Sequence, residues 1–172
     1  YLLDQPEQAF TFATDVYSDP GTPESIKRTA LIWLGRIHFD SEEYDEALNC
    51  FESTVKFGGN AGAESQFMIS KIKYNLADYE SAETNIFTLV SDFSAYDEWK
   101  FKGFLLLVRT YIGLNDLFQA RATAESIMEN VDVEWVQNAC SDLMMDIESM
   151  EGSELNGTEL IETGTQNEVN DK

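Results

Sequence analysis

Basic residues are scarce in this chain. It contains 11 Lys and Arg against 32 Asp and Glu, which gives a formal net charge of −21 at pH 7. Proteins that bind nucleic acid or anionic lipid neutralise phosphate with clustered Lys and Arg, so this composition excludes both classes of ligand. The excess of acid is explained by solubility or, alternatively, by a basic protein partner.

Long hydrophobic runs are also missing, because no segment approaches the roughly 18 consecutive apolar residues of a membrane-spanning helix. We therefore expect no direct insertion into a membrane. The two cysteines, Cys50 and Cys140, lie 90 residues apart and form no CxxC pair. This spacing argues against a disulfide and against a cysteine-based metal site, and it leaves the redox compartment undetermined.

Groups that carry catalysis are few. His38 is the single histidine of the chain, and it lies among apolar residues at helical spacing, which favours a packing role over a catalytic one. The sequence has no second histidine for a metal site, no phosphate-binding glycine loop, no nucleophile elbow and no EF-hand loop. We therefore expect no enzyme activity, no cofactor and no bound metal.

The chain has only three prolines, and its apolar residues recur at the spacing of helices, which predicts an all-α fold. Asp19-Pro20-Gly21 ends the first helix. Thr22-Pro23-Glu24 opens the second with a capping hydroxyl, a proline at the first helical position and an acid in the first turn. Gly58-Gly59 ends the third helix, because glycine tolerates a positive φ. The predicted helices cover residues 5–18, 23–40, 43–57, 61–76, 79–92, 97–113, 116–130 and 134–149.

One pattern of residues occurs three times along the chain. Each copy places a pair of neighbouring residues in one helix and a small alanine, followed by a further core residue, in the next. The alanines are Ala47, Ala82 and Ala120, with spacings of 35 and 38 residues. Periods of about 20 to 50 residues are typical of solenoids, in which each repeat buries its apolar face against its neighbours. The copies are Leu34-Gly35 with Ala47 and Phe51, Ile69-Ser70 with Ala82 and Ile86, and Leu107-Val108 with Ala120 and Ala124.

The copies predict one repeat domain over residues 1–150. It is expected to hold a half repeat at 5–18, full repeats at 23–57, 61–92 and 97–130, and a capping helix at 134–149. Residues 151–172 are rich in Thr, Asn and Glu and are expected to form a disordered acidic tail. Ala9 lies 38 residues before Ala47, so the first helix corresponds to the second half of a repeat. We therefore expect the chain to be the C-terminal part of a longer repeat protein.

These copies resemble the tetratricopeptide repeat family. The resemblance implies a right-handed superhelical solenoid of antiparallel helix hairpins that binds a protein or peptide on its concave face. The copies depart from the family pattern where His38 replaces an aromatic residue, and where Gln66 and Lys73 occupy positions that are normally apolar. The best copy consists of Leu31, Leu34, Gly35, His38, Tyr44, Ala47, Phe51 and Thr54.

The amino-acid sequence of the repeats is also similar to that of the looser repeats of bacterial cell-envelope proteins. An example is the segment Ala77-Asp78-Tyr79-Glu80-Ser81-Ala82. That resemblance implies a periplasmic or outer-membrane-associated location ahead of a cytoplasmic one.

In the family, the first helix of each hairpin lines the concave face. One groove position holds Arg36, Lys71 and Arg109 here, so the resemblance implies a row of basic residues through an acidic domain. Apolar residues flank this row and would suit an extended or helical peptide with acidic groups. The alternative is packing alone, with Arg36 paired to Asp40 four residues later and the other two paired to acids on adjacent helices. The flanking residues are Phe39, Tyr74 and Ile112 on one side and Ile32, Phe67 and Leu105 on the other.

The expected function is therefore protein–protein interaction or scaffolding. A second hypothesis makes the chain a regulatory or substrate-presenting domain of a larger enzyme, whose catalytic part lies before Tyr1. A third hypothesis is self-association through the exposed N-terminal half repeat.

Overall fold

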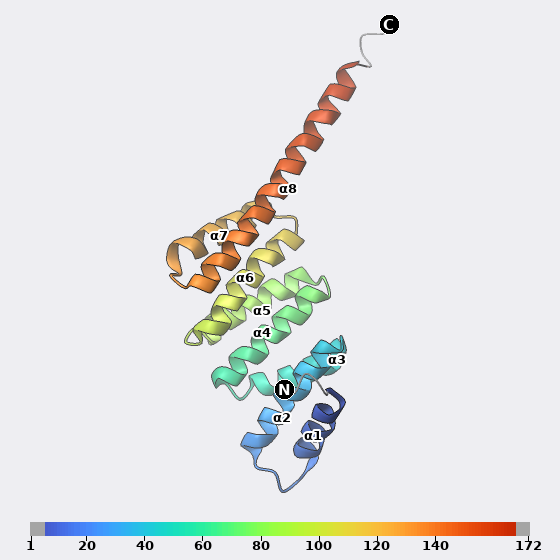
Figure 1. Ribbon diagram of the computed structural model, residues 1–172, viewed down its shortest axis with the longest axis vertical. Coiled ribbons are helices and arrows are strands. Elements are labelled where there is room, and N and C mark those ends of the chain that lie inside the picture. The colour runs from blue at the N-terminus through green and yellow to red at the C-terminus, as the bar shows by residue number, and fades with distance from the viewer. Residues whose placement is uncertain (1–5, 168–172) are drawn as a thin grey trace. The chain divides into compact units, whose positions relative to one another are not determined.

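The computed structural model describes residues 6–167, and within them it describes the side chains of residues 7–152. All regular secondary structure in this range is α-helical, which confirms the predicted all-α class (Figure 1). Seven of the eight helices begin and end within two residues of their predicted positions. The helices are α1 (Pro6–Ser18), α2 (Glu24–Asp40), α3 (Tyr44–Val55), α4 (Gly59–Asn75), α5 (Tyr79–Asp92), α6 (Asp97–Gly113), α7 (Leu117–Asn130) and α8 (Glu134–Asn167).

The chain divides into two compact units, Tyr1–Leu106 and Leu107–Lys172. The predicted repeat domain over residues 1–150 remains a prediction. The boundary falls inside α6, because the contacts on each side of it are mostly internal to that side. In the first unit, α1 packs on α2, α2 on α3, α3 on α4 and α4 on α5, and α2 also contacts α4. In the second unit, α7 packs on α8.

The last helix, α8, is longer than predicted. It continues to Asn167, whereas the sequence predicts a capping helix that ends at residue 149 and disorder over 151–172. Just past Met150, Glu151 is bound to α7, with its Oε1 accepting a hydrogen bond of 3.1 Å from Arg121 Nε. No proline follows between residues 151 and 167 to interrupt the helix. Residues 168–172 of the predicted tail lie outside the described residues.

The two helices of each hairpin (α2–α3, α4–α5 and α6–α7) are joined by the same type of turn. Glu42, Ala77 and Asn115 have φ values of 61°, 57° and 58°, and they follow one another at the 35- and 38-residue spacing of the repeat alanines. Each turn is a Schellman motif, in which a left-handed residue lets two amides reach the last carbonyls of the helix. In each motif the outer amide bonds the carbonyl five residues back, from Glu43 to His38 at 2.9 Å, from Asp78 to Lys73 at 3.0 Å and from Asp116 to Tyr111 at 2.9 Å.

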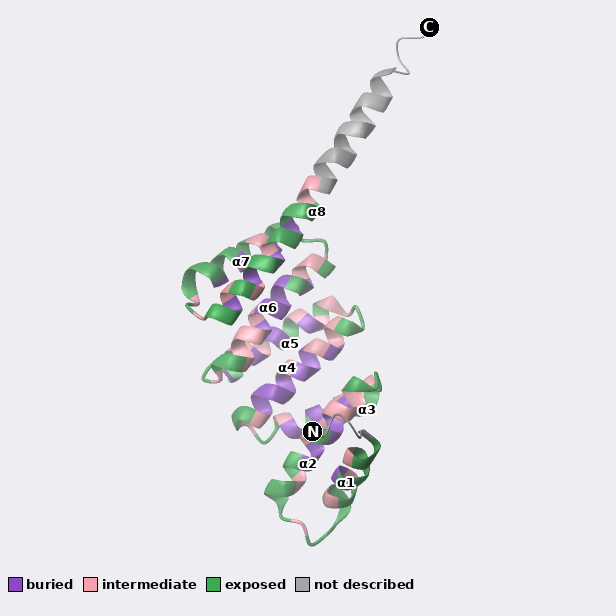
Figure 2. Cartoon of the chain, viewed as in Figure 1, coloured by how far each residue is buried: buried purple, intermediate pink, exposed green. Residues whose placement is uncertain are grey.

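Buried residues are interspersed with exposed ones along the helices (Figure 2), and the core positions of the three copies are equally buried. Ala47, Ala82 and Ala120 are fully buried, and so are the residues four positions later, Phe51, Ile86 and Ala124. Small side chains at the alanine positions let the two helices of a hairpin approach closely. The repeat that is visible in the sequence is therefore a repeat of turn geometry and of buried positions.

Two polar residues replace apolar ones in the second copy, and the structure satisfies both. Gln66 is buried, and its Nε2 donates to the backbone oxygen and to the side-chain Oδ1 of Asn85 at 3.1 and 3.0 Å. Half-buried Lys73 lies 3.8 Å from Asp78. Because buried polar groups are costly only when they lack partners, this copy folds like its neighbours.

The remaining sequence expectations concern isolated groups. His38 is half-buried, with its Nδ1 2.6 Å from Glu43 Oε2 and its ring edge-on to Phe10 at 5.5 Å. Cys50 and Cys140 are unpaired thiols, as predicted, and burial raises the pKa of each above its ordinary value. None of the helices between residues 6 and 167 combines the length and apolar character needed to span a bilayer, which agrees with the expectation of no direct membrane insertion.

Candidate partner-binding surface

Six of the seven predicted binding residues lie on the neighbouring helices α2 and α4. On each helix they follow the i, i+4, i+7 spacing, which places three side chains on one face. All six are half-buried, and the two helices are in contact. We call this set the α2–α4 surface; it consists of Ile32, Arg36 and Phe39 on α2 and of Phe67, Lys71 and Tyr74 on α4.

Arg36 is bound inside this surface. Its Nε donates to Glu64 Oε1 at 2.6 Å, and a second guanidinium nitrogen contacts the same oxygen. The Glu64 side chain, on α4, is only 7% exposed, and a buried carboxylate without a cation would be strongly unfavourable. The guanidinium also lies over the Trp33 ring, 4.7 Å from its centroid. The predicted pairing of Arg36 with Asp40 is therefore replaced by a pair between helices, because α4 brings a closer carboxylate that solvent does not screen.

Lys71 joins the two helices in a different way. Its Nζ lies 4.9 Å from the centroid of the Phe39 ring, at the distance of a cation–π contact. Among the residues whose side chains are described, no carboxylate pairs with Lys71. Lys71 therefore packs on an aromatic ring of the neighbouring helix, and the predicted pairing with an acid is not among the contacts of the described side chains.

Aromatic rings border Lys71 at the end of the surface. The ring centroids of Tyr74 and Tyr79 are 5.6 Å apart, and those of Phe39 and Tyr44 are 5.9 Å apart. The Tyr44 hydroxyl accepts a hydrogen bond of 3.2 Å from Asn75 Nδ2. These contacts hold the rings in tilted pairs, and Phe39 of one pair is the ring that Lys71 contacts.

The surface extends to α6 through residues that sequence reasoning missed. The ring centroids of Trp99 and Phe67 are 5.7 Å apart, and the indole Nε1 of Trp99 donates to Asn60 Oδ1 at 3.0 Å. Lys102 lies over the Trp99 ring at 4.2 Å and pairs with Glu98 at 2.7 Å. Trp99 could have been found from the sequence, because it lies in the first turn of the third repeat and large aromatic residues are enriched in protein interfaces.

Arg109, the seventh predicted residue, belongs to the second unit. It is exposed on α6, and within the described side chains it has no carboxylate partner. The structure therefore brings together Arg36 and Lys71 across α2 and α4, and describes Arg109 by itself. The continuous basic row remains a prediction.

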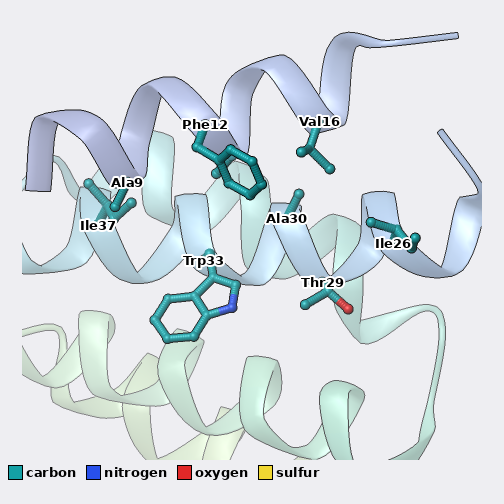
Figure 3. Close-up of a pocket in the computed structure, with 9 residues that line it drawn as sticks. Ala9, Phe12, Val16, Ile26, Thr29, Ala30, Trp33 and Ile37 are labelled. Atoms are coloured by element: carbon teal, nitrogen blue, oxygen red, sulfur yellow. The ribbon is translucent and has the colours of Figure 1, made fainter. Parts of the chain in front are cut away.

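An apolar hollow of about 230 Å³ lies between α1 and α2. Figure 3 shows Phe12 and Val16 projecting from α1 toward α2. Three large side chains of the hollow remain well exposed: Phe12 at 70%, Ile26 at 51% and Trp33 at 36%. We call this feature the α1–α2 hollow; it is lined by Ala9, Phe12, Ala13, Val16, Ile26, Thr29, Ala30, Trp33 and Ile37.

Among the described residues, no group of three or more His, Cys, Asp or Glu side chains is arranged to hold a metal ion. Comparison with models of known protein families finds no match for this chain. No curated protein matches it either.

Proposed function

We propose that this chain is a protein–protein interaction module of the tetratricopeptide repeat type, and that it binds a peptide segment of a partner on the α2–α4 surface. The single observation that carries the binding site is Lys71, whose amine lies over Phe39 without a carboxylate partner among the described side chains. The three equal hairpin turns and the equal burial of the repeat alanines support the family type.

The chemistry of the surface favours a ligand with one acidic residue beside apolar ones. Half-buried aromatic rings offer a large contact area while losing little conformational freedom, because they are already held by their neighbours. A carboxylate of the ligand would form a charge-assisted contact with Lys71. Arg36 has a different role. Its charge is neutralised by Glu64, so it holds α2 and α4 together and positions Trp33, and it does not contact the ligand.

The net charge of −21 does not prevent this interaction. At physiological ionic strength, charges separated by more than about 8 Å are largely screened, so distant carboxylates repel an acidic residue weakly. A contact with Lys71 acts at short range and is screened less. A strongly acidic ligand would still be disfavoured, so we expect an isolated acidic residue in the ligand.

The proposal is tested by selecting displayed peptides on the immobilised chain. The selected peptides should share an Asp or Glu next to aromatic or aliphatic residues. One of them is then labelled, and its affinity is measured by fluorescence anisotropy for the unchanged chain, for Lys71→Glu and for Lys56→Glu. Lys56 is an exposed lysine at the end of α3, so its substitution changes the net charge equally at a different place.

We expect Lys71→Glu to weaken binding about tenfold or more, since loss of a charged contact costs roughly 1.5–3 kcal/mol. Lys56→Glu should change affinity about twofold or less, as is usual for exposed charges. Equal affinities for the two variants, with unchanged circular dichroism, would show that Lys71 does not contact the ligand.

A further inference from the structure

The α1–α2 hollow is a second surface with its own chemistry, and it does not depend on the peptide site at Lys71. At about 230 Å³ it is smaller than the roughly 300–1,000 Å³ of typical small-molecule pockets. It suits a few inserted side chains better than a whole cofactor. Phe12 and Ile26 stand at its opening, with 70% and 51% of their surfaces exposed.

The hollow offers a ligand almost no hydrogen-bonding groups. Thr29 and Trp33 carry the polar groups of its lining. The Thr29 hydroxyl already donates to the backbone oxygen of Ser25 at 3.2 Å, which leaves the indole N–H of Trp33 as a donor. An extended peptide would therefore bury most of its backbone amides and carbonyls against side chains that cannot satisfy them. A helix satisfies these groups internally and inserts only its apolar side chains. The lining thus selects a helical occupant.

Helical spacing places two exposed carboxylates at the rim of the hollow. Asp15, which precedes Val16 and lies one turn after Phe12, is exposed, and so is Asp40, three residues after Ile37. Arg36 does not balance them, because it is paired with Glu64. The net charge of −21 also favours a cationic partner over an acidic one and disfavours a second copy of the same chain.

We propose that the α1–α2 hollow binds an amphipathic helix of a partner protein, with large apolar residues on one face and Lys or Arg on its flanks. The apolar residues enter between Phe12, Ile26 and Trp33. The basic flanks lie beside Asp15 and Asp40. This arrangement completes the burial of the exposed aromatic residues and neutralises the acidic rim.

Three labelled synthetic peptides test the proposal on the full chain. The first has Leu and Phe at helical spacing with Lys on the polar face. The second keeps the apolar face and replaces Lys by Glu. The third has the composition of the first with its order scrambled, so that apolar residues no longer share a face. Affinities are measured by fluorescence anisotropy at physiological salt, because electrostatic attraction alone weakens as salt rises.

Two matched variants locate the site. Phe12→Ser removes a side chain that is 70% exposed in the hollow, and Phe118→Ser removes one that is 79% exposed on α7. Neither change should affect folding, which circular dichroism verifies. We expect the basic amphipathic peptide to bind best, Phe12→Ser to weaken it about tenfold or more and Phe118→Ser to change it about twofold or less. Lys71→Glu should leave this binding in place, which separates it from the peptide site.

Three results would overturn the proposal. Equal binding of the scrambled and ordered basic peptides would indicate attraction by net charge only. Equal binding of the Lys and Glu peptides would remove the role of the acidic rim. Light scattering that gives a dimer for the unchanged chain and a monomer for Phe12→Ser would show that a second copy covers the hollow, as the hypothesis of self-association requires.

Discussion

The first and third hairpins, α2–α3 and α6–α7, have the same turn but opposite distributions of side-chain volume. In the first, Gly35 on the leading helix stands opposite Phe51, and a β-carbon at Gly35 would lie only 2.9 Å from the ring. In the third, the equivalent positions are Val108 and Ala124, both fully buried. The second hairpin is intermediate, with Ser70 and Ile86. As the residue on one helix grows, its counterpart on the other shrinks.

This comparison indicates that a hairpin conserves the summed volume of the two positions rather than either residue. Cores tolerate substitutions when total volume and pattern are kept, and they resist single enlargements. It also explains why the copies look irregular in sequence although their alanines are equally buried. The three predictions below would break or refine the comparison, beginning with the largest expected effect.

The first prediction transfers the residue pair of the second hairpin into the first. Gly35→Ser should destabilise the protein, because overpacking against Phe51 costs roughly 1–3 kcal/mol and the better helix propensity of serine returns about 0.5 kcal/mol. Adding Phe51→Ile should recover part of the loss. The free energy of unfolding in urea, followed by circular dichroism, measures both variants.

Phe51→Ile alone serves as the control, since it leaves a cavity and should also destabilise the chain. The double-mutant cycle is expected to give a coupling energy of about 1 kcal/mol in favour of the matched pair. Strict additivity of the two substitutions would contradict the conservation of summed volume.

The second prediction concerns the N-caps that follow the three turns. Asp116 Oδ1 accepts a hydrogen bond of 3.0 Å from the amide of Gln119, and Asp78 makes the same contact to Ser81 at 3.4 Å. Glu43 caps α3 without a side-chain hydrogen bond. Alanine should therefore cost about 1 kcal/mol at Asp116 and less at Asp78. At Glu43 it removes the contact with His38 but no cap hydrogen bond, so His38→Ala serves as its control. Urea unfolding of the variants tests this order, and a loss at Glu43→Ala that equals the loss at Asp116 and exceeds that of His38→Ala would show that the caps are not distinguished by their side chains.

The third prediction has the smallest effect and concerns the second unit. The hydrogen bond from Arg121 holds the pKa of Glu151 below its ordinary value of 4.5. A carboxylate with a depressed folded pKa stabilises the fold above its unfolded pKa, and this contribution is lost as the pH falls through the folded pKa. Stability should therefore decline below about pH 4.5 through this pair. The difference in melting temperature between the unchanged chain and Glu151→Gln isolates it, and a difference that does not depend on pH would contradict the assignment.

Much of the helical organisation could be predicted from the sequence. The alanine spacings of 35 and 38 residues recur in the positive-φ residues of the turns, because short-range rules of capping and helix termination determine where each helix ends. Gly58 and Gly59 both have φ of 64°, as predicted for the end of the third helix. Where each helix begins and ends depends on residues close in sequence, so sequence patterns of a few residues are enough to predict it.

The partners of the candidate site residues could not be predicted in the same way. Arg36 meets Glu64, 28 residues away on another helix, rather than Asp40 on its own. That choice depends on which faces of α2 and α4 come together, and helical spacing within one helix does not contain this information. Trp99 joined the surface for the same reason. The continuation of α8 past Met150 was not predicted, since composition alone does not register a contact between helices such as that of Arg121 with Glu151.

The succession of contacts in the first unit, from α1 to α5, has a consequence for how this part of the chain folds. Nearly all its helix pairs are neighbours in sequence, so its contact order is low and little loop-closure entropy opposes the formation of each contact. We expect rapid folding, in which a hairpin forms early and adjoining helices add to it. Because α1 packs only on α2 among the helix contacts described, it should be the first part of this unit to exchange its amide hydrogens.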